Sequence, residues 1–178
     1  KFAPDDAWGM HSVAHVYDMT HPTKAGIDLL ENNTGAWGHC NHFPYHGWWH
    51  QALLLLDQGP YDQVLGLYDP EHRAEQTDDY RDFSNASSLL LRLELEGVDV
   101  GDRWSELADL AESRSGDGCL VFADLHYMLA LAGDNRPDAA ARLTARVADT
   151  AQETTDQAQV MKDPGLAAAE GLAAFGEG

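Results

Sequence analysis

Four histidines near the start of the chain form two His-x-x-x-His pairs, His11 with His15 and His46 with His50. Residues four apart lie on the same face of an α-helix, so each pair would present two imidazole rings in one direction. Neutral imidazole is a common ligand of transition metals. If the two helices lie side by side, the four rings predict a site for a divalent ion such as Zn, Fe, Mn or Ni.

Two further residues are candidates for catalysis at such a site. Asp18 follows His15 by three residues and therefore shares its helix face, where a carboxylate could bind the metal or orient an imidazole through its ring N–H. His126 lies on a later helix, and stacking of helices could bring it to the same surface. We expect Asp18 or His126 to act as a general base or to support the metal ligands.

Aromatic residues surround the two pairs in the sequence. Trp8, Trp48 and Trp49 offer large flat apolar surfaces, and His42 lies in the loop just before the second pair. The functional interpretation is that these four residues line a pocket and contact an organic ligand. The alternative is that the tryptophans pack in the core and His42 faces water.

Other metal and catalytic signatures are absent from the sequence. The zincin motif requires Glu directly after its first His, whereas Ser12 and Gly47 occupy those positions here. The glycine motifs that bind phosphates and the Gly-x-Ser-x-Gly nucleophile elbow are also missing. The alternative to a metal site is a set of structural histidines, each hydrogen-bonded to a neighbouring carbonyl or carboxylate.

The composition limits the classes of partner. The chain of 178 residues has 30 Asp and Glu against 11 Lys and Arg, a net charge of −19. A negative field of this size repels nucleic acid and anionic lipid, and the longest purely apolar run, residues 52–56, is too short for a membrane span. The two cysteines, Cys40 and Cys119, belong to no Cys-x-x-Cys motif, which favours a reduced, cytoplasmic setting. From the charge and the short apolar runs we expect a protein that binds neither nucleic acid nor membrane.

The elements that must position the histidines read as helices throughout. Turn residues and prolines separate the apolar segments, and no stretch shows the period-2 alternation of strands. Asp5 or Asp6 can cap the first helix, and Pro44 starts the helix of the second His pair. The expected helices span residues 6–19, 22–31, 44–59, 61–68, 84–96, 104–113, 120–131, 137–152 and 165–175, with a long charged connection over residues 69–82.

The two His pairs start 35 residues apart, which is about the length of one helix-turn-helix repeat of the tetratricopeptide kind. We therefore predict an all-α fold of stacked antiparallel helical hairpins, a tetratricopeptide-like α-solenoid. The chain, residues 1–178, is expected to form a single helical-repeat domain that is part of a longer protein.

Several segments together resemble the tetratricopeptide repeat protein 38-like family. The family's His-x-x-Ala-His-Val motif matches residues 11–16, its His-x-Trp-Trp-His motif matches residues 46–50, and residues 57–69, 86–104 and 124–128 fit the same pattern. The likeness covers about residues 6–150. It implies an α-solenoid-like fold and a position in the C-terminal half of a longer protein, whose N-terminal half or a partner subunit would complete it. Where we expect Glu in the family, this chain has the shorter Asp18, which suits hydrogen bonding better than direct ligation.

The leading functional hypothesis is a helical-repeat protein whose His-rich, aromatic-walled pocket binds a small ligand through a metal and could catalyse a reaction on it. A second hypothesis is a tetratricopeptide-type scaffold that binds a protein or peptide on a concave helical surface, with structural histidines. A third is a rigid structural module of a larger assembly. The direction of the imidazole rings distinguishes the first hypothesis from the others, because ligand nitrogens must converge on one centre.

Overall fold

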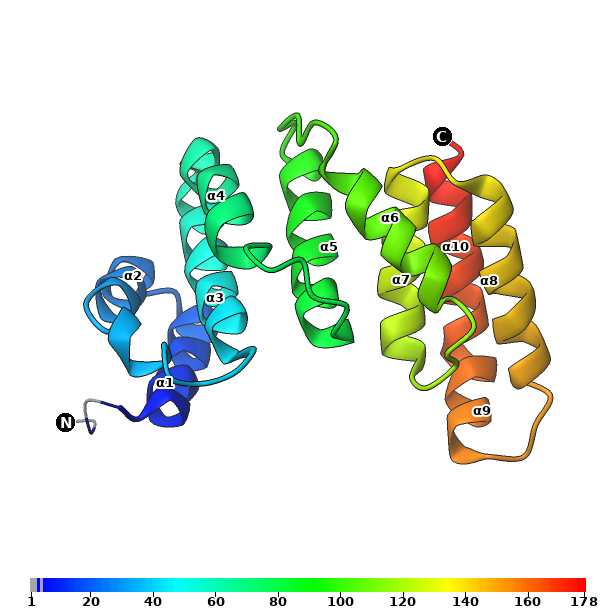
Figure 1. Ribbon diagram of the computed structural model, residues 1–178, viewed down its shortest axis with the longest axis horizontal. Coiled ribbons are helices and arrows are strands. Elements are labelled where there is room, and N and C mark those ends of the chain that lie inside the picture. Colours follow the sequence, from blue (N-terminus) through cyan, green and yellow to red (C-terminus); the bar gives the residue numbers. More distant parts are fainter. Residues whose placement is uncertain (1–2, 4) are drawn as a thin grey trace. The chain divides into compact units, whose positions relative to one another are not determined.

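A computed structural model describes residues 3 and 5–178 of the chain. This part consists of helices joined by turns and loops and contains no strand (Figure 1). The predicted all-α class is confirmed for these residues. Their contacts separate into two compact units. The first unit comprises Lys1–Thr77 with Glu96–Val98, and the second comprises Asp78–Leu95 with Asp99–Gly178.

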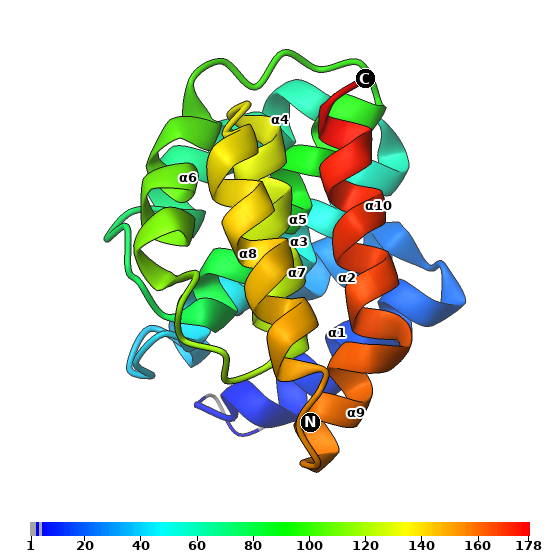
Figure 2. The ribbon, with the colours of Figure 1, turned by 90° about the vertical axis from the view of Figure 1, so that its right-hand side faces the viewer.

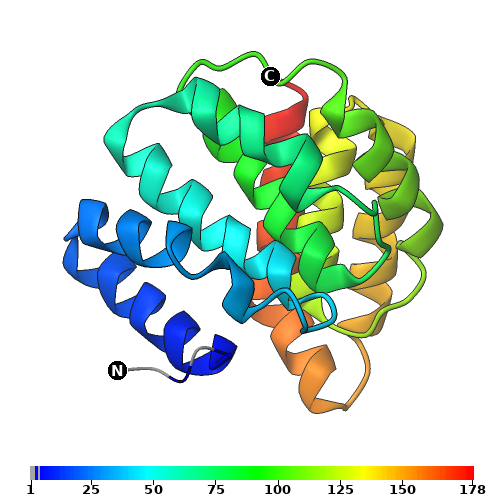
Figure 3. The same ribbon diagram turned by 60° about the vertical axis from the view of Figure 1, so that its left-hand side comes forward.

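The first unit carries both His pairs. The elements are α1 (Ala7–Thr20), α2 (Thr23–Glu31), the 3-10 turn η1 (Thr34–Ala36), α3 (Phe43–Gln58), α4 (Tyr61–Leu67) and the π turn η2 (Tyr68–His72). Short turns join α1 to α2 and α3 to α4, whereas a longer loop leads from α2 to α3 (Figure 3).

The ends of α1 and α3 follow from local chemistry. The side chain of Asp6 caps α1 by accepting a hydrogen bond from the backbone N–H of Gly9 at 2.8 Å, as the sequence predicts. Pro44 lies in the first turn of α3, where its missing N–H costs no helical hydrogen bond. Gly59 ends α3 with φ of +87°, a conformation that residues with a Cβ rarely adopt. Both histidine helices are thus held in place at their termini.

The core of the first unit lies between α1, α2 and α3. Met10 and Ala14 on α1 pack with Leu30 of α2 and Leu54 of α3, and all four are buried. Gly26 of α2 allows this close packing, because a Cβ there would lie only 2.8 Å from the Leu54 side chain. The buried residues Met10 and Ala14 immediately precede His11 and His15 in the chain. When Met10 and Ala14 face the core, the two imidazoles lie beside the buried face of α1.

The second unit is a helical bundle around α7 (Figure 2). α7 packs against α5, α6, α8 and α10, and its buried side chains include Met128 and Leu131. The elements are α5 (Tyr80–Leu95), α6 (Arg103–Arg114), α7 (Val121–Gly133), α8 (Pro137–Thr150), α9 (Asp156–Val160), the π turn η3 (Met161–Gly165) and α10 (Leu166–Gly176).

The segment predicted to be a long charged connection, residues 69–82, is shorter than expected. The turn η2 extends α4 to His72, and α5 begins at Tyr80. Asp79 marks the start of α5 because its side chain accepts the backbone N–H of Arg81 at 2.9 Å. Neither the turn η2 nor the early start of α5 could be predicted, because this acidic stretch lacks the apolar pattern on which helix prediction depends.

None of the helices in the described part of the chain combines the length and the apolar character that crossing a bilayer requires. This finding agrees with the short apolar runs of the sequence.

Candidate metal centre

The two histidine helices lie side by side in the same direction. Among the ring pairs that join them, three lie at matching positions: Trp8 with Phe43, His11 with His46, and His15 with His50. The ring centroids of these pairs are 4.7, 4.8 and 4.5 Å apart. The partners in each of these three pairs are 35 residues apart, so residue numbers increase in the same direction along both helices. α1 and α3 are therefore parallel and in register, and the two His-x-x-x-His pairs face each other.

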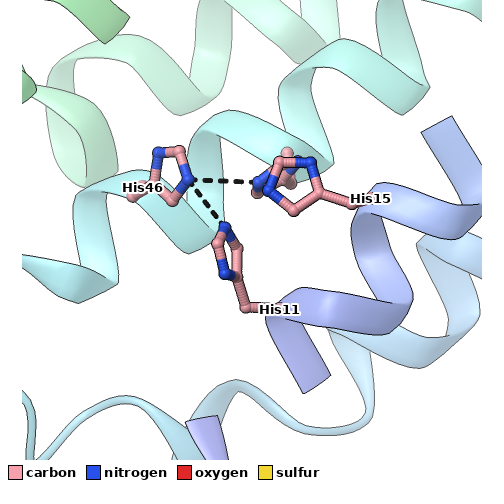
Figure 4. Close-up of side chains that lie close together, drawn as sticks. His11, His15 and His46 are labelled. Atoms are coloured by element: carbon pink, nitrogen blue, oxygen red, sulfur yellow. Dashed lines mark hydrogen bonds between the residues drawn. The ribbon is translucent and has the colours of Figure 1, made fainter. Parts of the chain in front are cut away.

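The four imidazoles converge. The Nε2 atom of His46 lies 2.9 Å from Nε2 of His11 (Figure 4) and 3.2 Å from Nε2 of His50. One ligand atom from each of His11, His15, His46 and His50 can be chosen so that all four lie within 4.8 Å of one another. The predicted set of metal ligands is thus brought together by the fold.

The two short contacts of His46 Nε2 are more than one linear hydrogen bond can satisfy. A ring nitrogen of neutral imidazole carries either one proton or one lone pair, so it takes part in one conventional hydrogen bond. Here the same nitrogen approaches two other ring nitrogens. A cation between the rings would remove the conflict, because it accepts a lone pair from each of them.

The distances also agree with a small coordination sphere. Four nitrogens bound at 2.0–2.1 Å in tetrahedral geometry are about 3.3 Å apart. The contacts among His11, His46 and His50 are close to this value, at 2.9 and 3.2 Å. His15 completes the group from the solvent side, since its side chain is exposed while that of His50 is buried.

Asp18 reaches the histidine of the other helix. Its Oδ2 atom lies 2.7 Å from Nδ1 of His50. A carboxylate only accepts, so the proton of the neutral His50 ring must be on Nδ1, and its Nε2 keeps a lone pair directed at the other imidazoles. The second oxygen, Oδ1, is buried and accepts no hydrogen bond from any described residue. Asp18 therefore orients a ligand and offers one more acceptor beside the cluster.

The environment favours neutral imidazole, the form that binds metal. The pKa of His11 is lowered to about 4, mainly by burial and also by the nearby His50 and His15, while Asp18 acts in the opposite direction. Burial and His50 lower the pKa of His15 as well, again opposed by Asp18. At neutral pH His11 and His15 therefore carry no proton that a metal ion would have to displace.

Two of the predicted tryptophans border the cluster. Trp49 stacks on His46 with a centroid distance of 5.4 Å and an interplanar angle of 17°. Trp8 touches the edge of His11 at 5.8 Å and also packs against Phe43, yet 68% of its surface is exposed. Phe43 itself lies 5.3 Å from His11 and 6.2 Å from His46. Its position 35 residues after Trp8 repeats the interval between the His pairs.

Trp48 and His42 lie apart from the four rings. Trp48 makes an edge contact with Trp37 at 5.8 Å, and His42 precedes α3 with an exposed side chain, 6.3 Å from the ring of Tyr45. Trp37 itself packs on Gly47, where a Cβ would lie 3.0 Å from its ring. Gly47 therefore lets the loop before α3 close against the helix between His46 and Trp48.

His126 belongs to the second unit. Its Nδ1 atom bonds to the carbonyl oxygen of Phe122 at 2.7 Å, and burial lowers its pKa. The neighbouring Asp124 is buried and pairs with Arg146 of α8. These contacts assign the polar groups of α7 to helix packing, and the role of His126 in catalysis stays a prediction.

His72 is a buried histidine of the first unit that the sequence did not single out. It ends η2, is 3% exposed, and stacks on Tyr68 with an interplanar angle of 23°. Its pKa is lowered to about 3, mainly by burial; the Trp48 backbone opposes this shift, and Arg73 and His46 add to it. Its isolated position in a charged stretch gave no periodic signal.

No model of a known protein family matches the chain, and no solved structure matches it. The resemblance to the tetratricopeptide repeat protein 38-like family therefore stays a prediction, and the geometry of the histidines carries the functional argument.

Proposed function

We propose that the first unit holds a divalent transition metal through His11, His15, His46 and His50, and that the metal binds a small organic ligand. The observation that supports this most strongly is the position of His46 Nε2, within 2.9 and 3.2 Å of two other ring nitrogens. A proton satisfies both contacts only as a shared, three-centre hydrogen bond, whereas a metal ion binds the lone pair of each ring. An all-nitrogen set of ligands suits Zn, Co, Ni or Fe better than Mg or Ca.

The outer contacts match those of known metal–histidine sites. Ligating imidazoles usually donate their other N–H to a carboxylate or carbonyl, and Asp18 fills this place for His50. Solvent or a ligand would reach the metal from the side of the exposed His15, either as a fifth ligand or in place of that imidazole. A metal in such a site polarises a bound carbonyl or lowers the pKa of a bound water, so a hydrolytic or related reaction is the activity we propose.

The parallel register of α1 and α3 supports a helical-repeat architecture for this part of the chain. Adjacent repeats of the tetratricopeptide kind place equivalent helices about 34 residues apart. Here the equivalent positions are 35 residues apart, and α2 packs against both helices. The proposal is that the site is built from equivalent helices of two consecutive hairpins.

The metal proposal is tested by elemental analysis of tag-free protein that has been stripped with a chelator and dialysed against Zn or Co. We expect one ion per chain in the unmodified protein and none in His46→Ala. His42→Ala is the matched control, because His42 belongs to the same segment but lies outside the cluster. Failure of the unmodified protein to retain an ion, or retention by His46→Ala equal to that of the control, would overturn the proposal.

A scaffold function is the second candidate, and an exposed apolar patch on α1 favours it. Val16 and Met19 are 53% and 79% exposed on the side of α1 away from the core. Clustered exposed apolar groups are typical of binding surfaces. Substitution of both by Ser should abolish partner binding and leave the metal content unchanged if the two functions are separate.

A further inference from the structure

We propose that the ligand of the metal centre carries an oxygen donor joined to a flat apolar ring, and that this ring packs on Trp8. The inference rests on the proposed metal centre and names the class of molecule that the centre binds.

Trp8 is placed to contact a molecule bound at the metal. It lies on the same stripe of α1 as His11 and His15, three and seven residues before them. Three residues correspond to about 4.5 Å along a helix, one turn from the nearest ligand. A donor group attached directly to a phenyl ring covers such a distance.

The indole ring of Trp8 is exposed but held in place. Its contacts with Phe43, at a centroid distance of 4.7 Å, and with the edge of His11 restrict the ring, while 68% of the residue remains accessible. A preorganised aromatic surface binds a flat apolar group with little further loss of conformational entropy. The open surface is next to His11 and lies two turns along α1 from the exposed His15.

The charges around the site select the donor group. Lys24 and Arg73 are the cationic side chains between residues 5 and 77. Lys24 pairs with Asp28 at 3.1 Å, and Arg73 donates to the carbonyl oxygen of Thr77 at 3.1 Å. Phosphorylated molecules would therefore meet an acidic surface without a basic partner. Four neutral imidazoles leave the charge of the metal intact, which favours an oxygen donor such as a carbonyl, a carboxylate or a chelating hydroxamate.

The experiment uses the full chain loaded with Co(II), whose visible absorption reports changes in coordination. Acetohydroxamic acid and benzohydroxamic acid share the donor group and differ in the flat ring. We expect the benzo compound to bind about ten-fold more tightly to the unmodified protein, a preference within the range of aromatic contacts and apolar burial. Trp8→Ala should reduce this preference to about two-fold, while its affinity for acetohydroxamic acid stays within about two-fold of the original. Trp8→Phe should restore most of the preference.

Phe175→Ala is the matched control, since Phe175 is a 62% exposed aromatic residue of the second unit. It should leave the preference unchanged. Equal binding of the two acids to the unmodified protein, or the same preference in Trp8→Ala, would overturn the inference and leave the metal centre standing. Absence of cobalt binding would overturn the proposed function, and the ligand class with it.

Discussion

Asp18 on α1 and His50 on α3 are joined by a 2.7 Å contact between Oδ2 and Nδ1. The contact crosses from one parallel helix to the other and determines which nitrogen of His50 faces the remaining imidazoles. Since His50 is 1% exposed, its ring has little freedom to turn once this bond is made. The pair thus connects the packing of the helices to the chemistry of the cluster.

Asp18→Asn should weaken metal binding by roughly 10- to 100-fold, the usual effect of losing the carboxylate behind a histidine ligand. The amide can turn its NH₂ toward Nδ1, which would place the ring proton on Nε2 and block the lone pair. Equilibrium dialysis with Zn measures the change. Asp28→Asn serves as control because Asp28 pairs with Lys24 on the exposed side of α2. Equal affinities of the two variants would show that Asp18 does not support the metal.

His15→Ala should keep one ion per chain but bind it more weakly. His15 is the exposed member of the group, while His11, His46 and His50 form the compact set of Nε2 atoms. We expect a loss of at least roughly 10-fold for His15→Ala, comparable to removal of an outer partner. His11→Ala should lose stoichiometric binding, as expected for His46→Ala. Cobalt absorption spectra of the two variants distinguish these outcomes, and identical behaviour would contradict the proposed division between an exposed ligand and a compact set.

Gly47→Ala should destabilise the first unit by about 1 kcal/mol. A Cβ at this position would lie 3.0 Å from the Trp37 ring, which is 3% exposed and cannot move outward without losing its packing. The helix propensity of Ala offsets part of this cost. The control is Gly66→Ala in α4, where the Cβ meets open space and the same change should stabilise by about 0.5–1 kcal/mol. Urea unfolding of both variants gives the two signs, and a stabilised Gly47→Ala would show that Trp37 does not pack as described.

The metal-free protein should lose stability as the pH falls below about 6.5. The folded-state pKa of His72 is lowered to about 3 by burial, so between these values the unfolded chain binds a proton that the folded chain does not. Stability therefore rises with pH in this window and falls on acidification, by at most about 1.4 kcal/mol per pH unit for one group. His11, with a pKa near 4, acts in the same direction with a smaller contribution because it is half-buried.

His72→Leu isolates the contribution of this residue to the pH dependence. The variant should show a shallower decrease of the urea midpoint between pH 7 and pH 5, in the presence of chelator, than the unmodified protein. His39→Gln, in the exposed loop before α3, is the control and should leave the slope unchanged. If His72→Leu and the control have the same slope, the buried imidazole is not the group that titrates on unfolding.

Much of this protein follows from local sequence. Asp6, Pro44, Gly59 and Pro137 lie at helix ends as their chemistry predicts, because caps and breakers act on the neighbouring backbone alone. The spacing of four residues likewise predicts that His11 and His15 share a face, whatever the helix packs against. The set of four converging histidines could be predicted because the same interval of 35 residues separates His11 from His46 and His15 from His50.

Contacts between helices were beyond the reach of the sequence. Asp18 shares a face of α1 with His15, yet its carboxylate contacts His50. The parallel register of α1 and α3 brings Nδ1 of His50 to within 2.7 Å of Asp18 Oδ2. Trp48 and Trp49 are adjacent in the chain and point about 100° apart around α3. Which ring each one meets depends on packing: Trp48 contacts Trp37, and Trp49 stacks on His46. His72 shows no pattern and becomes buried through the π turn that follows α4. Helix ends and shared faces depend on residues a few positions apart, whereas the partner of a ring nitrogen depends on how two distant helices pack.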